Sequence, residues 1–199
     1  MKYTLALLIV TAATSPAATL TIVMSNDFDA FSLTNPFLDS TGSTLANGDL
    51  VQLGYFETTG TPGNNGGSFD GFVAVESVSF AVGADGKFTD QVTLDDANDL
   101  PGTNSQTLQF GLRIFDASTI AAANFFNTVT DDEWVFSFSN ANPPPTPSEL
   151  NLAPDFGATD PVWQDAGNPL QTSITIPEPS TSLTALLGLA LLTGKRRRK

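Results

Sequence analysis

The stretch from Gln106 to Phe115 alternates apolar and polar side chains, and this pattern constrains the fold more than any other feature of the chain. Successive side chains of a β-strand point to opposite faces, so the alternation is typical of a strand with one buried face. Its apolar face consists of Leu108, Phe110, Leu112 and Ile114. Four further stretches with β-type patterning are Thr19–Met24, Asp49–Glu57, Phe88–Leu94 and Glu133–Ser139.

Segments rich in Gly, Asn, Asp and Pro separate these stretches and indicate turns. Examples are Asn47-Gly48, the run from Gly60 to Gly67, Gly83–Gly86 and Leu100-Pro101-Gly102. Several short strands between such turns, with little helical periodicity, predict an all-β chain. We expect an antiparallel β-sandwich or a jelly-roll-like single domain.

Two stretches lack the clear alternation of the strands above. Phe72–Val82 alternates only in part, so it fits either a strand or a short helix that leads into a strand. Ala117–Asn124 is predicted to form a helical turn, with Asp116 or Ser118 as its N-cap.

The chain has neither cysteine nor histidine. This excludes Ser-His and Cys-His nucleophiles, disulfides, and the usual zinc, copper and haem sites. No G-x-S-x-G, P-loop or G-x-G-x-x-G motif occurs. Asp and Glu are abundant enough for a glycosidase pair, but nothing in the sequence selects one. We therefore predict that the protein is not an enzyme.

The formal net charge of −13 hides a more acidic central part. Only Lys87 and Arg113 lie between Ala18 and Ile176, against 20 Asp and Glu, which gives that part a charge of −18. Nucleic acid is excluded as a partner, because binding it requires many phosphate-neutralising Lys and Arg residues. The acidity favours a solvated surface that resists aggregation.

Residues 1–17 have the three parts of a secretory signal peptide. Lys2 provides the positive start, an apolar run extends from Leu5 to Ala13, and Ser15-Pro16-Ala17 forms a small-residue cleavage site. We predict recognition by a Sec-type export machinery and cleavage by signal peptidase after Ala17.

The C-terminus combines three features in a fixed order. Pro177-Glu178-Pro179 is a rigid, extended segment. An apolar stretch at residues 181–194 follows and predicts a hydrophobic helix that contacts the membrane, although it is short for a bilayer span. The chain closes on a basic cluster of Lys195, Arg196, Arg197, Arg198 and Lys199. The positive-inside rule then puts the C-terminus in the cytoplasm and the rest of the chain outside.

This order of Pro-Glu-Pro, short Leu-rich segment and terminal basic cluster resembles the PEP-CTERM tail of bacterial exported proteins. The resemblance is confined to residues 177–199. It implies an exosortase-type membrane transpeptidase as partner and cleavage near the Pro-Glu-Pro. It also implies a location at the cell envelope, the cell surface or in an extracellular matrix. A plain membrane anchor is the alternative explanation of the same features.

Nine of the 13 prolines fall between Pro143 and Pro179. This composition predicts a linker at residues 141–176 that holds the domain away from the membrane. A segment wrapped on the domain also fits. In either case Pro169–Ile176 can add an edge strand. The predicted organisation is then a leader at 1–17, a β-rich domain at 18–140, the linker, and the tail at 177–199.

Calcium is the only cofactor for which ligands are plentiful, because it binds carboxylate and carbonyl oxygens of loops. The best cluster is Asp95, Asp96 and Asp99, although it does not match the EF-hand pattern.

The alternative role to a purely structural one is a carbohydrate-binding module for exopolysaccharide. Aromatic rings offer sugars an apolar face with a polar handle, and Tyr55 and Trp163 are the candidate ligand-binding residues. Trp134 shares its strand face with Phe136 and Phe138, a pattern more typical of a core.

Overall fold

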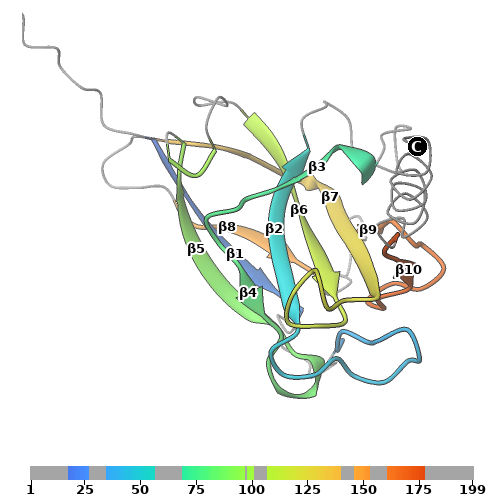
Figure 1. Cartoon of the computed structure of the whole chain (residues 1–199). Helices are drawn as coiled ribbons and strands as arrows, with labels where there is room; N and C mark the ends of the chain where they lie inside the picture. The colour runs from blue at the N-terminus through green and yellow to red at the C-terminus, as the bar shows by residue number, and fades with distance from the viewer. Residues whose placement is uncertain are drawn as a thin grey trace, which may run out of the picture.

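Two β-sheets pack face to face in the computed structural model of this chain (Figure 1). The structure describes residues 18–26, 35–56, 69–96, 98–100, 107–139, 146–152 and 161–177. The expected all-β sandwich is confirmed: short 3-10 turns at Phe69–Gly71 and Ala84–Gly86 are the helical elements of the described part. The predicted C-terminal helix lies outside these residues.

The larger sheet has seven strands, with the main order β10-β7-β6-β2-β3. Its centre consists of β2 (Leu50–Phe56), β6 (Thr107–Phe115) and β7 (Phe125–Ser137), all antiparallel to their neighbours. The strands β3 (Phe72–Ala74) and β4 (Phe80–Ala81) both pair with β2, while β9 (Val162–Trp163) and β10 (Ile174–Thr175) both pair with β7. The alternation at 106–115 thus predicted the central strand β6.

The smaller sheet has three strands, in the order β5-β1-β8. Its central strand β1 (Thr19–Ser25) is antiparallel to β5 (Thr89–Asp95) and parallel to β8 (Ser148–Asn151). The first strand of the described chain therefore lies between a strand from the middle and one from near the end.

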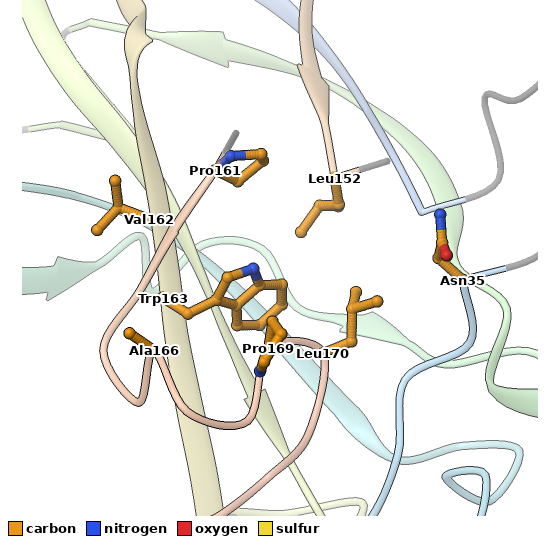
Figure 2. A pocket seen from close by; sticks show the side chains of 8 residues that line it. All are labelled: Asn35, Leu152, Pro161, Val162, Trp163, Ala166, Pro169 and Leu170. Carbon is orange, nitrogen blue, oxygen red and sulfur yellow. The ribbon is translucent and has the colours of Figure 1, made fainter. Parts of the chain in front are cut away.

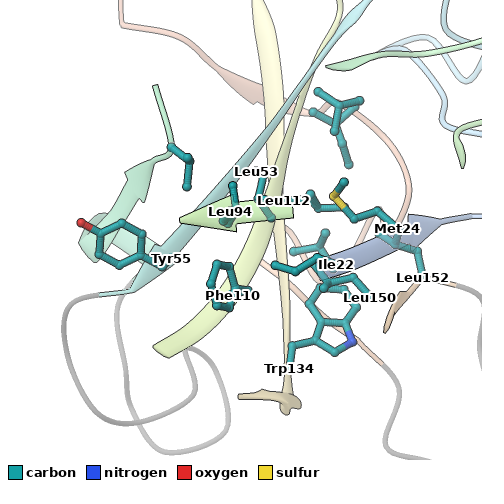
Figure 3. Packing of buried hydrophobic residues seen from close by; sticks show 14 of the residues in the cluster. Ile22, Met24, Leu53, Tyr55, Leu94, Phe110, Leu112, Trp134, Leu150 and Leu152 are labelled. Carbon is teal, nitrogen blue, oxygen red and sulfur yellow. The ribbon is translucent and has the colours of Figure 1, made fainter. Parts of the chain in front are cut away.

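The core fills the space between the two sheets (Figure 3). Ile22 and Met24 of β1 and Leu150 of β8 face Leu53 and Leu112 of the larger sheet, and all five are fully buried. Trp134 joins this cluster at 4% exposure, which agrees with the prediction of a core residue. Burial of these side chains supplies the main driving force of folding.

The outer face of the larger sheet carries a second apolar layer. Gly54 and Gly111 are paired across β2 and β6, and the ring of Phe72 lies so close to Gly54 that a Cβ there would be 2.3 Å from it. The guanidinium of Arg113 lies over the rings of Phe72 and Phe126, at 4.3 and 5.1 Å from their centroids. Burial lowers the pKa of Arg113, although the carboxylate of Asp70 opposes this effect.

The structure shows what the two stretches without clear alternation form. Phe72–Val82 forms the two short strands β3 and β4, both paired with β2, and no helix. The 117–124 stretch makes a single turn, in which the Ala123 amide bonds the Thr119 carbonyl. Asp116 does not cap its start: its Oδ1 accepts from the amides of Asn124 and Phe125 at the end.

The described parts of residues 141–176 differ from the expected linker. They contribute β8 to the smaller sheet and β9 and β10 to the larger one, so these stretches belong to the sandwich. The edge strand expected within 169–176 is present as β10. No helix in the described ranges is long and apolar enough to cross a bilayer, and the predicted membrane segment 181–194 lies outside them.

Candidate functional site

The acidic loop after β5 uses its carboxylates to hold its own backbone. Asp99 Oδ2 accepts from the Asp95 amide at 2.7 Å, and Asp95 Oδ1 accepts from the Asn98 amide at 3.2 Å. Asp96 Oδ1 accepts from the Ala18 amide at 3.1 Å. Within the described ranges, no group of three or more acidic side chains is arranged to hold a metal ion. Calcium binding by Asp95, Asp96 and Asp99 remains a prediction.

Tyr55 and Asp99 line the same pocket, of about 280 Å³. Glu76, Ser77 and Asn98 complete its polar lining, beside the apolar Val73. Tyr55 lies at the edge of the core, at 9% exposure, with its hydroxyl directed away from the other labelled side chains (Figure 3). The pocket therefore combines one aromatic residue with carboxylate, amide and hydroxyl groups.

Trp163 lies in a different and more apolar pocket, of about 360 Å³ (Figure 2). The indole is surrounded by Leu152, Pro161, Pro169 and Leu170, and it is 7% exposed. Trp163 is the last residue of β9, and the loop that follows it is fixed by Asn127 of β7, whose Nδ2 donates to the carbonyls of Asn168 and Gln171. The structure does not bring Trp163 and Tyr55 together in one pocket.

A β-bulge in β7 holds the most perturbed acid of the described chain. The register between β6 and β7 shifts between Gln109 and Gly111, which leaves the Asp131–Trp134 stretch without ladder partners on β6. Gln109 Nε2 donates to the Asp131 carbonyl and closes the bulge. Asp131 is 3% exposed, and burial, helped by a hydrogen bond with Asp132, raises its pKa to about 6.

The last described residues run directly from the sheet into the Pro-Glu-Pro segment. Strand β10 pairs with the start of β7, Ile174 with Phe126 and Thr175 with Phe125. The Ile176 amide then donates to the Asn124 carbonyl at 2.9 Å. Pro177 follows immediately and borders a hollow lined by residues 120–125. Glu178, Pro179 and the basic cluster lie outside the described residues.

Residues 175–199 match the family model of the PEP-CTERM protein-sorting motif. The chain carries a PEP-CTERM sorting motif. This motif marks an exported, sorted protein of the cell surface that is processed by an exosortase. No curated protein and no solved structure matches this chain.

The match to the PEP-CTERM motif begins inside β10, two residues before the Pro-Glu-Pro. The sorting motif and the β-sandwich thus share residue 175 and its pairing with β7. The order of parts in the sequence was enough to find the motif. An edge strand within Pro169–Ile176 was expected, but a two-residue strand has no periodicity that could fix its bounds.

Sequence reasoning missed most of the residues that line the two pockets. Glu76, Ser77 and Asn98 approach Tyr55 only through the pairing of β3 with β2 and through the loop after β5. The perturbed carboxyl of Asp131 stands in a visible acidic run, Asp131-Asp132-Glu133, but the run does not show that only its first member is buried. Its burial follows from the bulge.

Proposed function

We propose that this chain is a non-enzymatic protein of the cell envelope or the extracellular matrix, held at the membrane through residues 181–194 until its tail is cut. The PEP-CTERM match at 175–199 is the observation that carries this proposal. The basic cluster at 195–199 stays in the cytoplasm by the positive-inside rule, while the sandwich lies outside. The exosortase cuts the chain near Pro177-Glu178-Pro179 and transfers the sandwich to its final acceptor.

The predicted membrane segment supports a temporary rather than a permanent hold. Residues 181–194 would extend roughly 21 Å as a helix, against a hydrocarbon core of about 30 Å. Local thinning and snorkelling of the basic cluster can bridge this difference at some cost. A segment with this mismatch suits an intermediate that is soon processed.

Intact mass spectrometry of the protein from the envelope fraction tests this proposal. We expect a chain that begins at Ala18 and ends near residues 177–179. Replacement of Pro177, Glu178 and Pro179 together by alanine should leave the tail attached. The matched control is Pro147→Ala, a described proline before the motif. A wild-type protein that retains residues 181–199 in the mature envelope fraction would show that the tail is a plain anchor.

A second function, binding of exopolysaccharide, is favoured by the pocket at Tyr55. Sugars combine apolar ring faces with many hydroxyl groups, and this pocket joins an aromatic residue to Glu76, Ser77, Asn98 and Asp99. The Trp163 pocket suits sugar less well, because mainly proline and aliphatic side chains line it. We therefore propose Tyr55 rather than Trp163 as the centre of carbohydrate binding.

Isothermal titration of the processed protein with oligosaccharides of the cell's own exopolysaccharide tests this second function. The variants Glu76→Ala and Asn98→Ala should weaken binding about tenfold or more, because each removes a side chain that would hydrogen-bond the sugar. The exposed Asp90→Asn is the matched control and should bind normally. Repeating the titration with millimolar calcium and with chelator measures calcium dependence. Equal binding by all variants would place the sugar elsewhere.

A further inference from the structure

Ala18, the first residue after the predicted leader, is part of the folded sandwich. It is 7% exposed and belongs to the core cluster. It directly precedes β1, whose first residue, Thr19, exchanges two backbone hydrogen bonds with Ser139, at 2.9 and 3.0 Å. The backbone at this point is therefore fixed by pairing on its C-terminal side.

Ala18 and Asp96 form a reciprocal pair of hydrogen bonds. The Asp96 amide donates to the Ala18 carbonyl at 3.0 Å, and the Ala18 amide donates to Asp96 Oδ1 at 3.1 Å. Asp96 is 8% exposed. The nitrogen of Ala18 thus lies in hydrogen-bond contact with a buried carboxylate, and pairing of Thr19 with Asp95 sets this position.

We infer that Asp96 is the binding site for the α-amino group that leader cleavage creates at Ala18. This inference rests on the export processing proposed above. Hydrolysis of the Ala17–Ala18 peptide bond adds one water, leaves a carboxylate on Ala17, and turns the Ala18 amide nitrogen into an ammonium group. The same nitrogen that donates to Asp96 at 3.1 Å then carries a positive charge.

The gain of charge strengthens this contact, because the hydrogen bond to the Asp96 carboxylate then joins two opposite charges instead of a neutral donor and a charged acceptor. It also gives the buried carboxylate an opposite charge, which offsets the cost of burying it. The central part of the chain has only Lys87 and Arg113 as cations against 20 acids, so a further cation at Ala18 is a substantial addition.

The contact suits an N-terminus at Ala18 better than one at either neighbouring residue. A cut one residue later would leave the ammonium on Thr19, whose nitrogen bonds the Ser139 carbonyl at 2.9 Å rather than a carboxylate. A cut one residue earlier would leave Ala18 with an ordinary amide. Cleavage after Ala17 therefore produces the N-terminus that the sandwich is built to bind.

Four exported and processed proteins test this inference: the wild type, Asp96→Asn, a chain with one glycine inserted between Ala17 and Ala18, and the combination of both changes. The inserted glycine moves the ammonium away by one residue but leaves Ala18 with an amide that still donates to residue 96. Mass spectrometry of each N-terminus and thermal unfolding are measured. Asp90→Asn on β5, whose side chain is exposed, is the matched control.

We expect Asp96→Asn to lower the unfolding midpoint by roughly 5 °C in the natural N-terminal context and by much less after the glycine insertion. The control Asp90→Asn should leave the unfolding midpoint unchanged, both with and without the inserted glycine. A mature chain that does not begin at Ala18 would overturn both the assigned processing and the inference. A chain that begins at Ala18 but loses the same stability from Asp96→Asn in both contexts would overturn the inference alone.

Discussion

The buried carboxyl of Asp131 makes the stability of this fold depend on pH in the opposite direction to most carboxylates. Its pKa of about 6 lies above the ordinary value of 3.8, because the bulge removes the carboxyl from water. Folding is therefore favoured by the protonated form. The contribution of Asp131 is complete below about pH 4 and is lost as the pH rises through about 6.

Asp131→Asn should therefore stabilise the protein at pH 7 and have little effect at pH 4. Asparagine keeps the oxygen that accepts from the Glu133 amide but carries no charge. We expect a gain of up to about 3 kcal/mol at pH 7, the equivalent of the pKa shift. Urea unfolding of wild type, Asp131→Asn and the exposed Asp90→Asn from pH 4 to 7 measures it. A gain that is the same at every pH would contradict this account.

The glycines Gly54 and Gly111 allow phenylalanine rings to pack closely on the outer face of the larger sheet. A Cβ on Gly54 would lie 2.3 Å from the Phe72 ring and 2.6 Å from the Val73 carbonyl oxygen. Gly54→Ala should therefore displace Phe72, the ring on which Arg113 rests.

We expect Gly54→Ala to cost about 1–3 kcal/mol of unfolding free energy, the usual effect of overpacking. The matched control is Gly83→Ala, where the nearest atom to a new Cβ is the Lys87 carbonyl oxygen at 3.1 Å. The control should cost under about 1 kcal/mol. Urea unfolding at pH 7 compares the two, and equal costs would show that the Phe72 ring moves without penalty.

A single buried amide joins β7 to the loop that follows β9. Asn127 is fully buried and uses both side-chain atoms: Oδ1 accepts from the amides of Thr128 and Asp165, and Nδ2 donates to two loop carbonyls. An amide with all its partners satisfied rigidifies its surroundings, whereas unpaired loop groups are costly.

Asn127→Ala should loosen this loop and expose Trp163. The loss of four hydrogen bonds, with buried partners left unpaired, is expected to cost about 2–4 kcal/mol. Tryptophan fluorescence, measured with Trp134→Phe as background, should shift to longer wavelength. The exposed Asn124→Ala is the control. An unchanged emission spectrum together with full stability would show that the loop is held by other contacts.

Strands with one buried and one exposed face were predicted from the sequence. The strand segment that is buried on both faces was missed. Strands β1, β2 and β6 alternate because one face meets the core. The first half of β7 was not predicted, because Asn127, Thr128, Val129 and Thr130 are buried on both faces and show no alternation. Strands β8 and β9 were hidden by the proline-rich composition and by their short length, whereas an edge strand within Pro169–Ile176 was expected and is present as β10.

The candidate sites divide in the same way. The sorting motif is contiguous, so its order of parts could be recognised from sequence alone. The pocket at Tyr55 joins residues from β2, β3 and two loops, and the chain carries no local signal for such a meeting. The contact of Ala18 with Asp96 likewise spans two strand ends that are far apart in sequence.

The closeness of the sorting motif to the sheet should limit the rate at which the motif is processed. Among the described residues, Ile176 still donates a backbone hydrogen bond to Asn124, directly before β7, and Pro177 is the next residue. A processing enzyme has to enclose the extended chain around the bond it cuts, and the sandwich stands in the way.

Insertion of Gly-Ser-Gly-Ser between Ile176 and Pro177 should therefore speed removal of the tail severalfold, because a flexible linker moves the motif away from the sheet. Pulse-chase labelling followed by gel electrophoresis measures the rate. The same insertion between Gly194 and Lys195, beyond the predicted membrane segment, is the positional control. Equal rates for the wild type and the first insertion would show that the sandwich does not obstruct the enzyme.

The position of β1 between β5 and β8 has a consequence for the timing of folding during export. An exported chain crosses the membrane from its N-terminus, so β1 emerges first, yet Ile22 pairs with Ser148 and Met24 with Leu150, near the other end. Such distant contacts form slowly, because a long loop has to close before they are made. The smaller sheet cannot be completed until β8 has crossed. The chain therefore stays incompletely folded, and able to pass through a narrow channel, for most of its translocation. The sandwich is completed only when little more than the tail remains to be translocated.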